Sequence, residues 1–413
     1  MSHYLPIFGK RHYVPLLLVL AVYLGSLLFA SYKGGPVGAV ADTTYAGSLA
    51  CRACHRAIYD SFVTTAHNRA SSLASAETIA GHLDAGRNTF KFNQLSSVLL
   101  GADSGVFFQA AYLGGAEYKR APIDIVVGSG RKGQTYLYWR DNVLLQDPIS
   151  YYTPADCWCN SPGYPKNGPY FDRVTNARCL ECHASYATAL DGSTNDIAYF
   201  QKSSVLYGIN CERCHGPSEA HVLFHTAHPD EKASRLILTK NDMTRQQKLD
   251  VCGLCHSGIR VSVKPPFSFV AGGRLSDYSA VKYDPDSAAL LDVHGNQYGL
   301  LTSSKCFMNS QMTCSSCHNV HQTEIAQPRI YSARCMACHN PSSHNECTVR
   351  EVPGLVLSNN CIDCHMPLLP SKAIYLQLEN SRLSTPDFVR THRVAIYPKV
   401  SSEFLRKLAK ASR

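Results

Sequence analysis

The first pattern along the chain is an apolar run near its start. Residues 13–30 carry no charge and follow the basic pair Lys10-Arg11, and small residues at 39–41 offer a cleavage site further on. The run is longer than the core of a usual signal peptide and just long enough to span a bilayer. We therefore expect residues 1–41 to be a signal peptide or an N-terminal membrane anchor.

A second pattern, of period two, lies between residues 106 and 152. Apolar and polar positions alternate in 123–127, and β-branched and aromatic residues flank a turn at Asp141-Asn142. This pattern predicts a small antiparallel β section at about 106–152.

Beyond residue 175 the apolar stretches are short. Residues 244–255 have helical spacing, whereas 265–286 are rich in Gly, Pro, Ser and Asp, which is typical of loops. We therefore expect a mainly α and irregular fold, with the β section as an insertion.

Seven short motifs explain why so long a chain has so little regular pattern. Each is Cys-x-x-Cys-His, and every C-x-x-C pair in the chain is followed by that histidine. The motifs, numbered 1 to 7, are Cys51-Cys54-His55, Cys179-Cys182-His183, Cys211-Cys214-His215, Cys252-Cys255-His256, Cys314-Cys317-His318, Cys335-Cys338-His339 and Cys361-Cys364-His365.

This motif is typical of covalent haem c attachment. Two thiols one turn apart add to the vinyl groups of a haem, and the adjacent imidazole binds the iron as proximal ligand. The alternative is zinc, but zinc does not require a histidine after every second cysteine. We therefore expect seven haem c groups, a haem-threaded domain over residues 42–372, and a C-terminal extension, 373–413, with a distal histidine and a basic tail.

The net charge of the chain does not indicate a nucleic-acid partner. The formal charge is +9, of which Lys10, Arg11 and Lys33 contribute three in the leader. Each ferric haem with ionised propionates adds about −1, so the loaded protein is close to neutral.

Histidines outside the motifs are candidates for the sixth, distal position of each iron, which decides between electron transfer and catalysis. His67, His321 and His344 follow motifs closely and are expected to bind neighbouring irons. His221, His225 and His228 form one helical stripe, of which one or two histidines face a haem. His82 is expected to be an ordinary polar residue.

Four cysteines belong to no motif. Cys306 and Cys347 bracket two motifs, and a disulfide between them would stabilise the fold by about 4 kcal/mol, although four cysteines allow three pairings. Cys157 and Cys159 are too close for an unstrained bond, which leaves a reactive or metal-binding pair as the alternative.

The flanks of the motifs resemble a known superfamily. Residues 45–48, 128–139, 160–164, 210–221, 313–321 and 365–367 are similar to exported multihaem cytochromes of the cytochrome c-554 and hydroxylamine oxidoreductase superfamily, and closest to the group often fused to tetratricopeptide repeats. The resemblance implies bis-histidine haems, with His67, His221, His294, His321, His344 and His392 as distal ligands. The chain has no such repeats and no lysine in place of a motif histidine.

Two functions follow from these expectations. The first is an electron carrier in respiration, periplasmic or anchored to the outer face of the cytoplasmic membrane. Its redox partners would be proteins such as a membrane quinol dehydrogenase or an extracytoplasmic reductase, with no nucleic acid. The alternative is an oxidoreductase that acts on a small nitrogen or sulfur compound at one five-coordinate haem.

Overall fold

The structure, a computed structural model, describes residues 44–194, 196–281, 290–324, 327–343, 347, 349, 357–379, 381 and 383–411. The chain divides into the units Met1–Thr44 and Tyr45–Arg413, and the expected signal peptide or anchor at 1–41 lies outside the described residues. Within the described ranges, no helix is long and apolar enough to cross a membrane. The features below all belong to Tyr45–Arg413.

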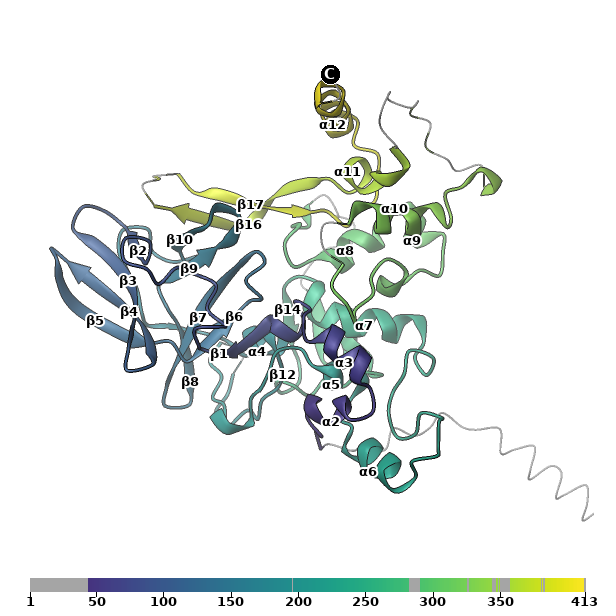
Figure 1. Ribbon diagram of the computed structural model, residues 1–413, viewed down its shortest axis with the longest axis horizontal. Helices are drawn as coiled ribbons and strands as arrows, with labels where there is room; N and C mark the ends of the chain where they lie inside the picture. Colours follow the sequence, from purple (N-terminus) through teal and green to yellow (C-terminus); the bar gives the residue numbers. More distant parts are fainter. Residues whose placement is uncertain are drawn as a thin grey trace, which may run out of the picture. The chain divides into compact units, whose positions relative to one another are not determined.

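Short helices carry most of the motifs (Figure 1). The helices are α2 (Ser48–Arg52), α3 (Arg56–Phe62), α4 (Ala177–His183), α5 (Cys211–His215), α6 (Glu219–Ala227), α7 (Arg245–His256), α8 (Gln297–Thr302), α9 (Lys305–Met308), α10 (Pro328–Met336), α11 (Cys361–His365) and α12 (Pro398–Ala411). Helix α7 begins after a capping box of Thr244 and Gln247, which confirms the helix predicted at 244–255.

Strands form two large antiparallel sheets. The strands are β1 (Ser71–Leu73), β2 (Thr89–Lys91), β3 (Ser96–Asp103), β4 (Val106–Leu113), β5 (Ala116–Pro122), β6 (Ile125–Val127), β7 (Gly133–Arg140), β8 (Val143–Gln146), β9 (Ile149–Tyr152), β10 (Cys157–Asn160), β11 (Arg173–Val174), β12 (Ala184–Tyr186), β13 (Leu206–Tyr207), β14 (Arg260–Ser262), β15 (Ser279–Val281), β16 (Leu368–Leu378) and β17 (Thr385–Arg390). One sheet has the order β2-β3-β4-β5. The other has nine strands in the order β1-β6-β7-β9-β10-β16-β17, with β8 between β7 and β11.

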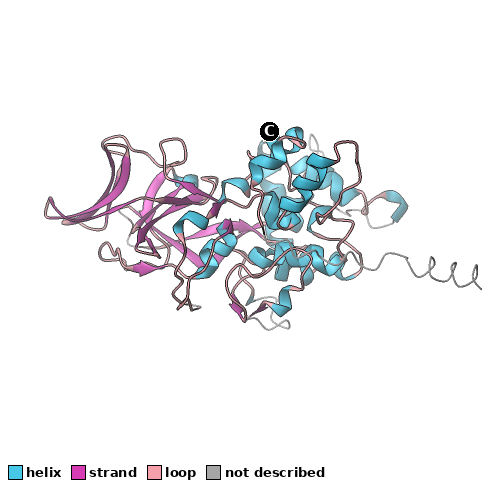
Figure 2. Cartoon of the chain, turned by 90° about the horizontal axis from the view of Figure 1, so that it is seen from below, coloured by secondary structure: helices cyan, strands magenta, loops and turns pink. Residues whose placement is uncertain are grey.

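The nine-stranded sheet is buried on both faces, because successive side chains of a strand point to opposite sides. Tyr136 and Tyr138 of β7 share one apolar core with Val98 of β3, in the other large sheet. Leu137 of β7 lies on the opposite face and packs in a second core with Leu180 of α4. The sheet therefore links the β part of the molecule to the helices that carry the motifs (Figure 2).

The β part is larger than the sequence predicted. Strands β6 to β9 and the turn at Asp141 confirm the pattern seen within 106–152. The hairpin β16-β17, however, joins the same sheet through Asn160 opposite Gln377. Helix and strand make up 30% and 25% of the chain, so the expectation of a mainly α fold was only partly right. Pairing between segments over 200 residues apart leaves no local pattern to detect.

A carboxyl group lies inside the β part without a partner. The side chain of Asp147 is fully buried, and neither of its oxygens has a hydrogen-bond partner among the described residues. Burial, with a smaller contribution from Asp124, raises the pKa of Asp147 well above its usual value. The buried group is therefore held as the neutral acid.

We predict that Asp147→Asn stabilises the protein at pH 7 to 8. When the pKa of a carboxyl is raised in the folded state, the free energy of unfolding of the protein falls as the pH rises above the pKa of the unfolded state, about 3.9. An amide does not titrate, so the variant does not lose this stability. The gain should be about 1–3 kcal/mol and should vanish below about pH 4. Denaturant unfolding followed by circular dichroism measures it.

Asp124→Asn is the matched control. An oxygen of Asp124 accepts a 2.7 Å hydrogen bond from the Trp139 backbone amide, and its charge is only the smaller cause of the raised pKa of Asp147, so this variant should show a clearly smaller gain. A stability difference between Asp147→Asn and the wild type that does not change with pH would contradict the neutral-acid assignment.

Candidate haem sites

The motifs are held as single helical turns. The amide of His55 donates to the carbonyl of Cys51 at 2.9 Å, and His318 and His339 make the same bond to the first cysteine of their motifs, at 3.0 and 2.9 Å. A helical turn places residues i, i+3 and i+4 on one face. Each motif therefore presents both sulfurs and the imidazole to the same side.

Four motif histidines each face a second histidine from elsewhere in the chain. We call these the axial pairs. The ring centroids are separated by 6.5 Å in His55–His221, 6.2 Å in His215–His321, 6.1 Å in His67–His256 and 6.1 Å in His318–His392.

This separation is the one that two imidazoles need on opposite sides of one metal ion. A metal–nitrogen bond of about 2.0–2.1 Å, plus about 1.1 Å from nitrogen to ring centre, gives roughly 6.3 Å across the metal. The separation of the ring centroids in the axial pairs therefore matches the separation needed by two imidazoles bound to one haem iron.

Backbone carbonyls fix which ring nitrogen faces the iron. The Nδ1 atoms of His215, His221 and His365 lie 2.7, 2.7 and 3.0 Å from the carbonyl oxygens of Leu238, Arg235 and Ala395. A carbonyl can only accept a hydrogen bond, so Nδ1 carries the proton and Nε2 keeps its lone pair for the metal.

His67, a predicted distal ligand, is positioned by a close backbone approach. The amide of Ile209 donates to the carbonyl of His67 at 2.8 Å. A Cβ on the neighbouring Gly208, whose φ is +69°, would lie 2.0 Å from the carbonyl oxygen of Asn68. Burial lowers the pKa of His67 to about 4, so the imidazole is neutral and able to bind metal at pH 7.

His294 has an electrostatic effect on the histidine of motif 2. Burial is the main cause of the lowered pKa of His183, and the charges of His256 and His294 lower it further. The assignment of His294 as a distal ligand stays a prediction from the sequence.

Sulfur atoms of different motifs lie close to one another. They are free thiols here and would become thioether sulfurs when haems are attached. Four pairs of cysteines from different motifs are joined by thiol hydrogen bonds, which raise the pKa of the cysteine named first in each pair. The pairs are Cys51–Cys211, Cys255–Cys182, Cys252–Cys314 and Cys335–Cys361.

Weaker charge interactions complete the series. Cys214 acts on Cys252, and Cys338 acts on Cys317, raising the pKa of each. These interactions link the motifs in the order 1–3–4–5–6–7, and motif 2 is linked to motif 4 through Cys182 and to motif 3 through a 2.9 Å hydrogen bond from Arg213 to the carbonyl of Glu181.

Acidic residues inside three motifs hold neighbouring segments in place. Glu212 of motif 3 accepts hydrogen bonds from the amides of Ala46 and Gly47, just before motif 1, at 2.8 and 3.0 Å. Asp363 of motif 7 accepts from Arg390 of β17 at 2.9 Å.

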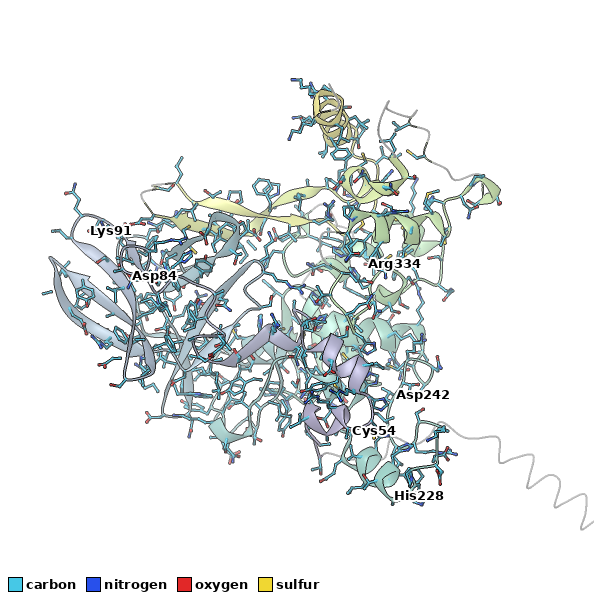
Figure 3. All side chains as sticks on the ribbon, viewed as in Figure 1. Cys54, Asp84, Lys91, His228, Asp242 and Arg334 are labelled. Carbon is cyan, nitrogen blue, oxygen red and sulfur yellow. The ribbon has the colours of Figure 1, made fainter. Side chains whose placement is uncertain are left out.

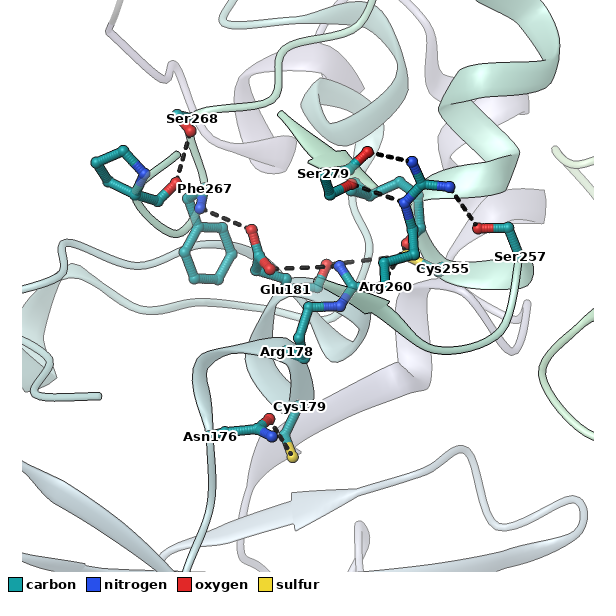
Figure 4. A network of polar contacts seen from close by, with 12 residues as sticks. Asn176, Arg178, Cys179, Glu181, Cys255, Ser257, Arg260, Phe267, Ser268 and Ser279 are labelled. Atoms are coloured by element: carbon teal, nitrogen blue, oxygen red, sulfur yellow. Dashed lines mark hydrogen bonds and ion pairs between the residues drawn. The ribbon is translucent and has the colours of Figure 1, made fainter. Parts of the chain in front are cut away.

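Glu181 of motif 2 is the centre of a similar network (Figure 4). It accepts from the amide of Phe267 at 2.9 Å and from Arg178 at 3.3 Å, and Arg178 also reaches the carbonyl of Leu254, next to Cys255. Sequence reasoning missed these three carboxylates, although an acidic residue between the two cysteines of a motif was a visible signal.

The predicted distal residues have different outcomes. His67, His221, His321 and His392 lie in axial pairs, and His344 lies outside the described residues. His225 lies beside His221, at 4.6 Å between ring centres, and His221 is the one that faces His55. His82 bonds to Asp156 at 2.8 Å in the β part, as an ordinary polar residue.

The cysteines outside the motifs are free thiols. Cys306 lies near Cys338, and Cys347 lies near Cys364, so the structure does not join Cys306 to Cys347. The disulfide stays a prediction from the sequence.

Cys157 and Cys159 both lie on β10. Burial raises the pKa of Cys159 to about 12 and raises that of Cys157 as well. Both remain protonated at neutral pH, which disfavours a reactive thiolate pair.

Comparison with known proteins agrees with this geometry. The family model "Cytochrome c554 and c-prime" matches residues 165–216, which include motifs 2 and 3. The solved structure titled "Crystal Structure of Outer Cell Wall Cytochrome OcwA" is similar with a TM-score of 0.52 and 16% sequence identity, over 87% of this chain and 81% of that chain. No protein of curated function matches the sequence. The chain has the fold of a multihaem c-type cytochrome.

We predict that His321→Ala leaves the number of attached haems unchanged and opens one iron. His321 lies 6.2 Å from His215 but takes no part in covalent attachment. Carbon monoxide added to the reduced variant should bind one more equivalent than it binds to the wild type. His82→Ala is the control and should bind no more than the wild type, and an unchanged His321→Ala spectrum would remove His321 from the ligands.

The ring planes of the axial pairs predict two kinds of electron paramagnetic resonance signal. The planes of His67 and His256 meet at 80°, whereas those of His55–His221 and His215–His321 meet at 14° and 11°. Near-perpendicular imidazoles leave two iron d orbitals almost equal in energy and raise the largest g value of low-spin ferric iron. The ferric protein should therefore show one component with an unusually large g value, and His67→Ala should remove it while His321→Ala keeps it.

Proposed function

We propose that this chain is a heptahaem c-type cytochrome that carries electrons between a membrane-side donor and an extracytoplasmic acceptor in respiration. The observation that carries the proposal is the set of axial pairs. In each pair the ring centroids of two histidines are 6.1–6.5 Å apart, so four irons would each have two histidine ligands. A bound haem supplies an iron that gains and loses one electron.

The chain's own residues favour electron transfer over catalysis at these positions. A second imidazole occupies the coordination site that a substrate would need. Burial of His67 and His392, both with a pKa of about 4, keeps the imidazoles unprotonated and excludes water around the metal. Such a site changes oxidation state without changing ligands.

The order of motif contacts supports a continuous path. Thiols are hydrogen-bonded between motifs 1 and 3, 4 and 5, and 6 and 7, and charge interactions link motif 3 to motif 4 and motif 5 to motif 6, so neighbouring haems along the series would be close. Motifs 1 and 7 end this series, and motif 2 ends its branch. These three are the positions where a donor or an acceptor would exchange electrons.

Location and partners follow from the sequence and belong to the proposal. An export signal or anchor at 1–41 would place the chain in the periplasm or on the outer face of the cytoplasmic membrane, where haem c is attached. The similar solved structure carries a title that names an outer cell wall cytochrome. A membrane quinol dehydrogenase and an extracytoplasmic reductase are the proposed kinds of redox partner, and the likeness to the hydroxylamine oxidoreductase group is part of the same proposal.

A second candidate is a multihaem oxidoreductase of a small nitrogen or sulfur compound. It is favoured by one specific observation: the axial pairs belong to motifs 1, 3, 4 and 5, and the sequence places only His344 close to motifs 6 and 7.

Two measurements on the purified full chain test the proposed carrier. A pyridine haemochrome spectrum should give seven haem c per chain, and far fewer would contradict the cofactor assignment. The fully reduced protein should pass about seven electron equivalents to an artificial acceptor. Steady turnover of nitrite or hydroxylamine, with a high-spin ferric signal that shifts on their addition, would replace the carrier with the oxidoreductase.

A further inference from the structure

Motif 3 carries two buried residues of opposite charge side by side. Glu212 and Arg213 lie between its two cysteines, on α5, and are only 2% and 7% exposed. A buried charge acts on its surroundings more strongly than a charge in water, because the protein interior screens it less. The two side chains therefore influence any haem that is bound close to them.

The carboxylate of Glu212 lies beside the contact between motifs 1 and 3. It accepts from two backbone amides just before α2, at 2.8 and 3.0 Å, and from the amide and hydroxyl of Ser218, at 3.1 and 2.8 Å. The hydroxyl of Ser48, the first residue of α2, donates to the sulfur of Cys211, which is bonded to the thiol of Cys51. All four donors to the carboxylate are uncharged, so its negative charge is not cancelled by them.

The guanidinium of Arg213 lies beside the contact between motifs 2 and 4. It donates to the carbonyl oxygen of Glu181 at 2.9 Å, and the sulfur of Cys255 lies 3.8 Å from the same oxygen. The thiols of Cys255 and Cys182 are bonded to each other. The guanidinium also lies 5.3 Å from the ring centre of Phe267, a contact that favours a buried cation.

The positive charge of Arg213 is not neutralised by an acidic residue in the described part of the chain. The nearby carboxylate of Glu181 is already paired with Arg178, at 3.3 Å (Figure 4). The Nε atom of Arg213 is buried and has no hydrogen-bond partner among the described residues. One uncompensated positive charge therefore remains beside the sulfurs of motifs 2 and 4.

These two charges have opposite effects on a haem that takes up an electron. Reduction adds one negative charge, so a carboxylate close by disfavours it and lowers the reduction potential, whereas a guanidinium favours it and raises the potential. Motif 3 holds both charges, so their effects on its own haem partly cancel.

Motif 1 is an exposed end of the series. Cys54 of motif 1 is exposed, and Figure 3 shows it well separated from Arg334, the residue just before motif 6. A haem attached there would be accessible to a redox partner.

We propose that Glu212 and Arg213 set a gradient of reduction potential, low at motif 1, intermediate at motif 3 and high at motifs 4 and 2, so that electrons enter at motif 1 and collect at the motif 2–motif 4 branch. The inference rests on the proposed electron carrier with seven haems. Neither residue binds iron, and both act through their charge.

A redox titration of the full chain, followed by electron paramagnetic resonance, tests the gradient. The haem of motif 4 is recognised by its unusually large g value, which follows from the 80° between the rings of His67 and His256. In the wild type this signal should disappear early in the reduction. The haem that is lost in Cys51→Ala with Cys54→Ala should be one of those reduced last. A large-g signal that disappears last would overturn the gradient without any variant of motif 3.

Charge variants of motif 3 test the cause. In Arg213→Gln, at the potential where the motif 4 haem of the wild type is half reduced, the ratio of reduced to oxidised haem should fall about tenfold, a shift of about 59 mV for one electron. Arg213→Lys keeps the charge and should stay near the wild type. Glu212→Gln should instead raise the potential of the haems reduced last. The matched control is Arg140→Gln, which removes an exposed charge in the β part and should change neither.

The outcomes separate this inference from the proposed function. With seven haems attached, an unchanged motif 4 potential in Arg213→Gln would overturn the gradient and leave the carrier intact. If Arg213→Gln does not attach all its haems, Glu212→Gln decides, and an unchanged low-potential end would overturn the gradient. A haem count far from seven in the wild type would overturn the proposed function itself.

Discussion

The proposed function depends on one coordination constraint: a haem iron with two imidazole ligands would hold them on opposite faces, at a fixed separation. A motif supplies the first imidazole within five residues of sequence. The second must come from another segment, as His392 would for His318, whose ring centroids are 6.1 Å apart. Each such pair would tie two distant parts of the chain to one metal, so haem binding and folding would be coupled.

The β part provides the rigid support for this arrangement. Both faces of its central sheet are buried, one against the second sheet and one against α4, which carries motif 2. Strand β1 pairs with β6 directly after the segment that holds His67. The imidazole of His67, the proposed distal ligand of motif 4, is therefore positioned by a sheet whose own core is made of apolar side chains.

Buried polar groups are used differently in the two parts. Glu212 and Glu181 have several donors each and fasten one motif to the next segment. Asp147 has no side-chain partner among the described residues and is held neutral. Carboxylates near the motifs are thus paired with donors and hold neighbouring motifs in place, because an unpaired charge there would disfavour burial of the haems.

The sequence by itself determined the attachment chemistry, because both cysteines and the proximal histidine lie within one helical turn. It also indicated strands β6 to β9, where alternation is local. Only the tertiary structure decided that His221 and not His225 faces His55, that β16 and β17 join the central sheet, and which motifs are neighbours. Those choices depend on contacts between residues about 160 to 220 positions apart, which the order of residues does not display.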